Sequence, residues 1–235
     1  MAKSWYDKAA RKQIELIFEL NDFRSPTPRP RTVRLRSPRA VFAAFHFRSE
    51  SMQTVVTAPY AAGVLPIAFR NNRLHFLLGE DIRNLGLSDF GGKAERRLDK
   101  GLITNTAARE FFEETLGLSI SSDQMVQRLL DPSRHIALKS RTANGNRYVM
   151  FVTEVPFVSE IASSYRKFSS FLRFKGIHKS LVEKTGVEWL TIDELRDASK
   201  RAVFERTFSE HEVLLSKIGN MNPREWHDFL RIRTS

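Results

Sequence analysis

The 235-residue sequence contains no cysteine and no long apolar run. Without cysteine the chain cannot form disulfide bonds, thiolate nucleophiles or cysteine-bearing zinc sites, although this says nothing about its compartment. No apolar stretch approaches the roughly 18 residues that a membrane-spanning helix needs, so we expect no membrane partner. The hydrophobic content of 41% is nevertheless enough for one core, which excludes wholesale disorder.

Motifs of several enzyme classes are also absent. Leu215 stands where the zinc-hydrolase pattern His-Glu-x-x-His would need its second histidine. Alanine follows Gly92-Lys93, which excludes a P-loop, and the chain has no Gly-x-Ser-x-Gly nucleophile elbow.

Acidic residues are outnumbered by basic ones, 27 to 38, which gives a formal net charge of +11. Such a surplus favours anionic partners such as nucleotides, nucleic acid or an acidic surface, although a basic surface also serves solubility alone. Residues 23–49 contain no acidic residue at all. They hold seven arginines, which are Arg24, Arg29, Arg31, Arg34, Arg36, Arg39 and Arg48.

The N-terminal part is expected to form a helix followed by an extended basic arm. Residues 4–20 combine a capping-box spacing with an apolar stripe, which predicts a helix. Four prolines between residues 26 and 38 then prevent helix propagation. We therefore expect residues 1–60 to precede a globular domain at 61–200, with a C-terminal helical extension at 201–235.

Two locations are compatible with this N-terminus. Its arginines and amphipathic start are typical of an organelle transit peptide. However, transit peptides are poor in acids, and the first helix and its end contain Asp7, Glu15, Glu19 and Asp22. A cytoplasmic location is the expectation, with organelle import as the alternative.

Strand and helix signals mix irregularly across residues 61–199. Apolar runs around Asn71-Asn72 predict one hairpin, and runs around Asn144-Gly145 predict a second with a two-residue turn. Residues 187–190 form a short predicted strand. Capping signals predict three later helix starts, at Thr191, Ser209 and Asn222. Without a regular βαβ alternation, the fold class is α+β or a layered α/β sandwich.

The most informative stretch is a helix with three glutamates on one side. A helical projection places Ala107, Phe111 and their neighbours on a buried face and Glu110, Glu113 and Glu114 opposite. Like charges at this spacing repel one another. A divalent cation would remove that cost, whereas the alternative is a solvated acidic face. The preceding Gly91-Gly92 favours the metal, because a glycine backbone can approach a metal or phosphate closely.

This stretch resembles the Nudix box, Gly-x5-Glu-x7-Arg-Glu-hydrophobic-x-Glu-Glu-x-Gly-hydrophobic. Gly92 matches the first glycine, and residues 109–114 match the core without a gap. Three extra residues separate Gly92 from Arg109, so the first box glutamate would fall on Leu98. Only Asp99 or Glu95 can stand in for it.

The end of the box departs from the pattern as well. Gly117 comes one residue late, and Leu116 occupies the expected glycine position. The extra residues lie in a loop, where length is tolerated. The helix that carries the three glutamates is intact, so the resemblance implies a Nudix-type α/β/α sandwich with a mixed sheet.

The resemblance also implies an activity and a set of residues. Nudix enzymes hydrolyse a nucleoside diphosphate linked to another group with Mg²⁺ or Mn²⁺. The resemblance places the metal on Glu113 and Glu114. Glu110 would be a further ligand or the base, and the Gly91 or Gly92 carbonyl would complete the coordination shell. Arg109 would organise the loop by pairing with an acid.

Two further roles follow from the resemblance. An acid from beyond the box would assist catalysis; the candidates are Glu154, Glu188 and, as first choice, Glu183. Lys93 would face phosphate, or alternatively support the loop backbone. Nothing in the sequence specifies the oligomeric state.

A second basic segment, residues 165–175, interleaves cations with aromatic rings. Such a segment either stacks bases and binds phosphates or simply buries its rings in the core. Together with Arg34 and Arg36 of the arm, it makes capped or polymeric RNA a more natural substrate than a free nucleotide. The leading function is therefore a metal-dependent Nudix pyrophosphohydrolase. The alternative is a catalytically weak Nudix-fold RNA-binding or assembly subunit.

Overall fold

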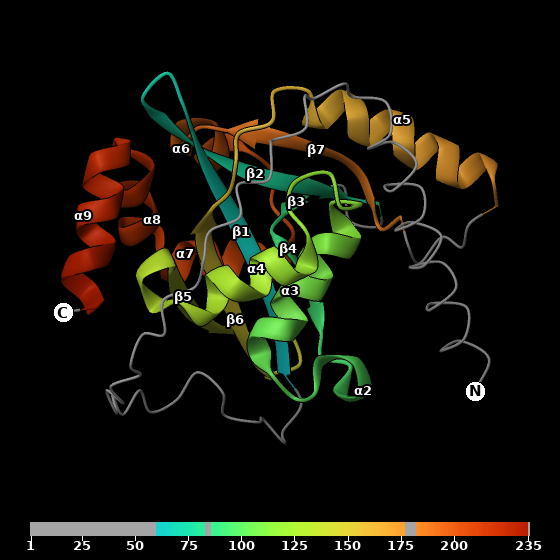
Figure 1. Ribbon diagram of the computed structural model, residues 1–235, viewed down its shortest axis with the longest axis horizontal. Coiled ribbons are helices and arrows are strands. Elements are labelled where there is room, and N and C mark those ends of the chain that lie inside the picture. The colour runs from blue at the N-terminus through green and yellow to red at the C-terminus, as the bar shows by residue number, and fades with distance from the viewer. Residues whose placement is uncertain (1–59, 83–85, 177–181, 235) are drawn as a thin grey trace, which may run out of the picture. The chain divides into compact units, whose positions relative to one another are not determined.

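A computed structural model of the protein describes residues 60–82, 86–176 and 182–234. The expected N-terminal helix, the basic arm and its residues Arg34 and Arg36 lie outside these residues. The described chain folds as strands and helices that alternate irregularly (Figure 1).

Seven strands form one mixed sheet in the order β3-β2-β1-β6-β5, with β4 paired to β1 and β7 paired to β2. The strands are β1 (Tyr60–Arg70), β2 (Arg73–Asp81), β3 (Leu87–Ser88), β4 (Phe90–Lys93), β5 (His135–Arg141), β6 (Arg147–Glu154) and β7 (Lys184–Leu190). β1 and β6 run parallel, and the other pairs are antiparallel. The long strand β1 therefore lies at the centre, where it contacts β2, β4 and β6.

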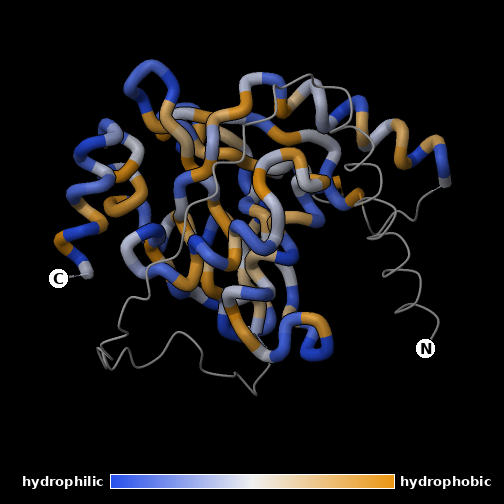
Figure 2. Tube along the Cα trace, viewed as in Figure 1, coloured by the Kyte–Doolittle hydropathy of each residue, from blue (hydrophilic) through white to orange (hydrophobic). Residues whose placement is uncertain are grey.

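Helices cover both faces of this sheet. They are α2 (Arg96–Asp99), α3 (Ile103–Glu114), α4 (Ser122–Leu130), the 3-10 turn η1 (Pro132–Arg134), α5 (Ile161–Phe174), α6 (Ile192–Asp197), α7 (Ala202–Glu210), α8 (Glu212–Gly219) and α9 (Pro223–Thr234). Figure 2 shows hydrophobic residues along the strands and hydrophilic ones at the turn between β1 and β2.

Alternation along β1 separates two cores. Ala62 and Val64 pack with buried residues of α3, α4 and α5, whereas Leu65 and Ile67 pack with buried residues of α6, α7, α8 and α9. The prediction of an α+β fold with a mixed sheet between helical layers is confirmed. None of the helices in the described ranges is long and apolar enough to span a membrane.

One predicted hairpin turn is confirmed and the other is longer than predicted. Arg70 pairs with Arg73, and Asn71 and Asn72 have φ values of 51° and 64°, as a tight two-residue turn requires. The second hairpin instead pairs Arg141 with Arg147 and leaves a loop at 142–146. Its Thr142 donates its N–H to the Asn146 carbonyl and accepts the Asn146 N–H on its hydroxyl, which closes the wider loop.

Two of the three predicted helix starts are confirmed. Thr191 caps α6 and Asn222 accepts the Glu225 N–H at the start of α9. The prediction of a start at Ser209 is wrong, because this residue lies inside α7. Its hydroxyl donates to the Glu205 carboxylate one turn earlier instead of capping a new helix.

The C-terminal helices contribute directly to the core of the second sheet face. The fully or almost fully buried residues they add include Phe204, Leu215, Trp226 and Leu230. The apolar side chains of residues 201–234 therefore pack on β1 and β2.

Trp226 provides a test of this packing. Its side chain is fully buried, so Trp226→Ala should lower the free energy of unfolding by about 3–5 kcal/mol through lost burial and a cavity. Val213 on α8 is 88% exposed, so Val213→Ala should change the free energy of unfolding by less than about 0.5 kcal/mol. Urea denaturation followed by circular dichroism measures both; equal values would contradict the shared core.

Candidate functional site

Strand β4 and helix α3 bring the glycine pair and the first glutamate together. α3 is fixed to the sheet by Ala107, Ala108 and Phe111, all fully buried. β4 pairs with β1, which places Gly92 opposite Ala62. A Cβ atom on Gly92 would lie 2.5 Å from the Glu110 carboxylate carbon. Only glycine therefore allows this carboxylate to lie against the strand backbone.

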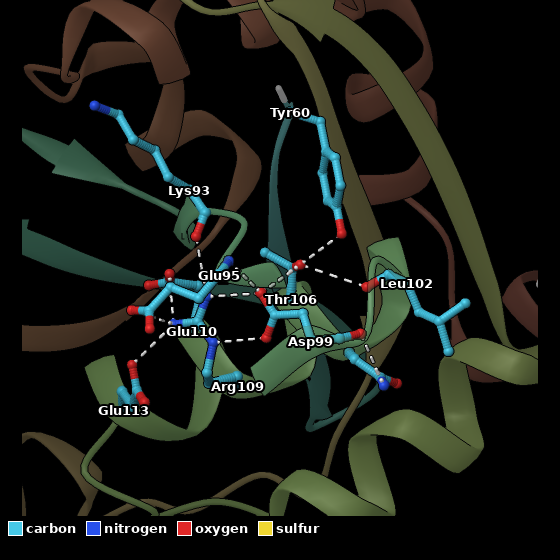
Figure 3. A network of polar contacts seen from close by, with 10 residues as sticks. Tyr60, Lys93, Glu95, Asp99, Leu102, Thr106, Arg109, Glu110 and Glu113 are labelled. Carbon is cyan, nitrogen blue, oxygen red and sulfur yellow. Dashed lines mark hydrogen bonds and ion pairs between the residues drawn. The ribbon is translucent and has the colours of Figure 1, made fainter. Parts of the chain in front are cut away.

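A buried ion pair between Arg109 and Asp99 holds the loop to the helix (Figure 3). Arg109 donates from Nε to Oδ1 at 2.8 Å and from Nη2 to Oδ2 at 3.1 Å. Asp99 is 1% exposed and also accepts the Glu95 N–H and the Thr106 hydroxyl. Glu95 is a poorer partner, because its carboxylate lies 4.0 Å from Arg109 and its side chain is half exposed.

This ion pair explains how the loop accommodates its extra residues. The loop forms the short helix α2, and Asp99 is the last residue of that helix. Lys100 and Gly101 then adopt φ values of 53° and 73° and turn the chain into α3. Of the two candidate acids, Asp99 is therefore the one that pairs closely with Arg109.

Arg109 also binds three other groups around the site. Nη2 donates to the Lys93 carbonyl at 3.0 Å, and Nη1 donates to Glu110 Oε1 at 2.8 Å and to Glu113 Oε2 at 3.1 Å. Burial lowers the pKa of Arg109, but the hydrogen bond to Asp99 and the charges of Glu110 and Glu113 outweigh this and leave the pKa raised. The guanidinium therefore stays charged and orients two glutamates.

The third glutamate faces a different cation. Glu114 is 5% exposed; its Oε2 accepts the Gly91 N–H at 2.9 Å, and its Oε1 lies 3.3 Å from Lys184 Nζ. Lys184 is fully buried and also donates to the Ser88 hydroxyl at 2.7 Å. The helical projection grouped the three glutamates on one side, whereas the structure engages Glu110 and Glu113 with Arg109 and Glu114 with Lys184.

Burial raises the pKa values of two acids of the site toward neutral pH. It raises the pKa of Glu110 to about 7, against the opposing charge of Arg109. It raises the pKa of Glu114 to about 8, against the opposing charge of Lys184. The negative charge of Glu183 contributes to both increases, so this exposed residue, immediately before β7, acts on the site electrostatically.

The remaining residues expected at the site have different surroundings. The Glu154 carboxylate lies 3.5 Å from His227 of α9, and Glu188 borders a surface pocket together with Glu80 and Arg166. Lys93 offers its carbonyl to Arg109, and its side chain points away from that network (Figure 3). The Lys93 backbone therefore supports the site, and the residue also lines the adjoining pocket.

That pocket lies on the other side of β4 and has a volume of about 250 Å³. A Cβ on Gly91 would lie 2.6 Å from the Tyr148 hydroxyl, just as one on Gly92 would clash with Glu110. The pocket walls include two aromatic rings and several polar side chains, namely Tyr148, Phe204, Asp89, Asn144, Asn146 and Arg201. Tyr60 also borders the pocket, but its hydroxyl lies 3.1 Å from the Thr106 hydroxyl on the α3 side. The two-glycine wall of the pocket separates it from the carboxylates of α3.

Asp89 is the buried acid of this pocket. It is 5% exposed and accepts a short hydrogen bond from the Tyr148 hydroxyl. Burial raises the pKa of Asp89 to about 6, although the bond from Tyr148 lowers it. No short-range pattern links these two residues, which are 59 positions apart, so sequence reasoning missed them.

Two residues at the C-terminal end of α3 have a left-handed backbone. Leu116 and Gly117 both have positive φ, 53° and 67°. Gly117 adopts this conformation without strain, but Leu116 is a side-chain-bearing residue that adopts it too. The Leu116 side chain is 1% exposed and packs in the core with Phe111.

The oxygen donors around α3 include groups that a divalent cation prefers. Among the residues that the structure describes, no group of three or more acidic or histidine side chains is arranged to hold a metal ion. Glu110 Oε1 and Glu113 Oε2 nevertheless converge on one nitrogen of Arg109, and both are hard oxygen donors. A cation would also offset the cost of burying Glu110 and Glu114. Their carboxylate oxygens are therefore of the kind that binds Mg²⁺ or Mn²⁺.

No family model and no curated protein sequence matches the chain. Among solved structures, the NUDIX domain of Shewanella oneidensis NrtR with ADP ribose is similar at 11% identity and a TM-score of 0.42, over 66% of this chain and 87% of that one. A C. elegans Ap4A hydrolase is similar at 13% identity and a TM-score of 0.39, over 68% and 99%. No functional conclusion follows from likeness at this level.

The buried ion pair yields a prediction about stability. Asp99→Asn keeps the side-chain size but leaves Arg109 buried without its principal acid, so the free energy of unfolding should fall by about 3–5 kcal/mol. Glu95→Gln is the matched control and should cost less than about 1 kcal/mol, because its contact with Arg109 is long and solvated. Urea denaturation measures both; a larger loss for Glu95→Gln would identify Glu95 as the true partner.

Proposed function

We propose that the protein is a divalent-metal-dependent hydrolase of the Nudix type that cleaves the pyrophosphate of a nucleoside diphosphate linked to another group. The observation that carries this proposal is the arrangement of Glu110 and Glu113. α3 holds both carboxylates at Arg109, and the Glu110 carboxylate lies against the Gly92 backbone. Hard oxygen donors are thus concentrated next to a strand that a phosphate can approach.

The metal would be held by Glu110 and Glu113, with Glu114 and the Gly91 or Gly92 carbonyl as further donors. When bound, such a cation neutralises the charge that develops on the phosphate oxygens. Glu110 is also suited to accept a proton from the attacking water, because burial raises its pKa to about 7. Glu183 is the alternative base. Arg109 fixes the orientation of Glu110 and Glu113.

The pocket behind β4 would bind the nucleoside end of the substrate. Ala143 and Val203 offer apolar contacts, and Asp89 and Asn144 offer hydrogen-bonding groups. Lys93 lines the same pocket and lies at the border between it and the glycine pair. A nucleoside there would place its phosphates near Gly92.

The basic segment on α5 supports RNA as the group attached to the pyrophosphate. Its rings divide between the two predicted roles: Tyr165 and Phe168 pack in the core, whereas Phe171 and Phe174 are 42% and 84% exposed. Lys175 lies over the Phe171 ring at 5.7 Å. Exposed rings beside cations suit stacked bases and their phosphates, which favours a capped or polymeric RNA substrate.

α5 also lies close to the carboxylates. Its Tyr165 donates a hydrogen bond to the carbonyl of Lys184, whose ammonium contacts Glu114. An RNA chain with its end at α3 would therefore continue along α5. The same surface would serve the alternative function, an RNA-binding subunit with weak catalysis. The observation that favours this alternative is the ion pair between Lys184 and Glu114, because it already occupies one carboxylate of the proposed metal site.

Hydrolysis assays test the metal proposal. Candidate substrates are capped RNA, ADP-ribose-like molecules, dinucleoside polyphosphates and inositol pyrophosphates, each with Mg²⁺ and with Mn²⁺. Glu110→Gln and Glu113→Gln should each lower kcat by at least about 100-fold without unfolding the chain. The control is Glu210→Gln on the exposed surface of α7, which should retain full activity.

The metal dependence of these variants separates their roles. Raising Mn²⁺ should partly rescue Glu113→Gln, which weakens the metal, but not Glu110→Gln, which removes the base. Equal rescue would make Glu110 only a ligand and move the base to Glu183. Full wild-type activity in excess chelator would refute the metal-dependent mechanism.

RNA binding provides a separate test of α5. Phe174→Ser should weaken the affinity for single-stranded RNA by about 5- to 100-fold, since stacking on an exposed ring contributes about 1–3 kcal/mol per base. The control Val213→Ser removes an equally exposed apolar side chain on α8 and should leave binding unchanged. Fluorescence anisotropy measures both; equal affinities would assign the α5 rings no part in RNA binding.

A further inference from the structure

Lys184 is a buried lysine that the sequence signals did not identify. It is fully buried at the start of β7, and its side chain passes directly over Gly79 of the neighbouring strand β2. A Cβ atom on Gly79 would lie 2.9 Å from Lys184 Cδ. The glycine thus leaves the space that lets the ammonium reach the interior.

The ammonium of Lys184 ends at the carboxylate helix. Its Nζ donates to the Ser88 hydroxyl at 2.7 Å and lies 3.3 Å from Glu114 Oε1. The other oxygen of Glu114 accepts the Gly91 N–H at 2.9 Å. Both oxygens of this buried carboxylate are therefore engaged within the protein, one of them by a positive charge.

Burying a lone carboxylate is costly, and a paired cation offsets much of that cost. At Glu114 the cation belongs to the chain itself. A divalent ion that binds the same carboxylate must approach this ammonium, and two positive charges a few ångströms apart in a partly buried site repel strongly.

We propose that Lys184 is a positioning residue, a tethered counter-cation that holds Glu114 in the metal-free protein and competes with a divalent cation for it. This inference rests on the proposed metal site. Lys184 thereby lowers the metal affinity of the site and leaves Glu110 and Glu113 as its more accessible ligands. The last turn of α3 also keeps its position when no metal is present.

Lys184→Met tests the competition, because methionine fills similar space without the charge. Isothermal titration with Mn²⁺ should give a Kd at least about tenfold lower than that of the wild type. The metal-free variant should also melt at a lower temperature, and Mn²⁺ should raise its melting temperature by more than it raises that of the wild type. An unchanged or higher Kd would overturn the proposal.

A second variant separates charge from packing. Glu114→Gln combined with Lys184→Met removes both charges, so the double variant should regain metal-free stability and lose the gain in Mn²⁺ affinity. A lysine that merely fills space would give no such recovery. The double variant also covers the case in which Lys184→Met alone does not fold.

Lys200→Met is the matched control. The Lys200 side chain is 4% exposed and lies 3.5 Å from Glu205, so it too is a buried lysine paired with an acid. Its acid belongs to α7 on the other face of the sheet, and its replacement should leave the Mn²⁺ Kd unchanged. A tenfold change in this control would overturn the specific role of Lys184.

Hydrolysis is not a readout of these experiments, so the two proposals fail separately. Mn²⁺ binding that tightens in Lys184→Met, without hydrolysis of any substrate, would refute the proposed function and support the role of Lys184. Metal-dependent hydrolysis with an unchanged Kd would refute the role of Lys184 alone. If neither protein bound Mn²⁺, both proposals would be wrong.

Discussion

The buried ion pair between Arg109 and Asp99 is the interaction on which the site depends. It ties α2 to α3, and the remaining donors of the same guanidinium reach the Lys93 carbonyl of β4 and the carboxylates of Glu110 and Glu113. One side chain thus connects a loop, a strand and a helix. Because a buried ion pair is strongly destabilised when one partner is lost, all four attachments depend on one another.

The sequence predicted those features that short-range patterns determine. The Asn71-Asn72 turn and the Thr191 cap rest on residues within a few positions of one another. Asp99 and Glu95 became candidate acids through the resemblance to the Nudix box. Ser209 and Asn144-Gly145 show the limit of such patterns, because the carboxylate of Glu205 and the backbone of Asn146 offered competing hydrogen-bond partners. A local sequence pattern fails to predict the structure where another nearby residue forms a better hydrogen bond with the same polar group.

Long-range pairs could not be predicted in this way. Lys184 meets Glu114 because β7 lies beside β2, and Asp89 meets Tyr148 because β6 lies beside β1. In both pairs a glycine of an adjoining strand leaves the necessary space, Gly79 in one and Gly91 in the other. In a single sequence these glycines signal close backbone approach but do not identify what approaches.

Leu116 terminates α3 in an unusual way. A left-handed backbone costs a leucine roughly 1–2 kcal/mol more than it costs glycine, yet this leucine is 1% exposed and fills space in the core. A glycine would terminate the helix because its backbone adopts the left-handed conformation freely. Here burial of the Leu116 side chain stabilises that conformation and offsets its cost. Glu114 lies two residues before this anchor. The reach of that carboxylate is consequently set by how well an apolar side chain packs, so a purely hydrophobic repacking around Leu116 would alter the chemistry of the acid cluster.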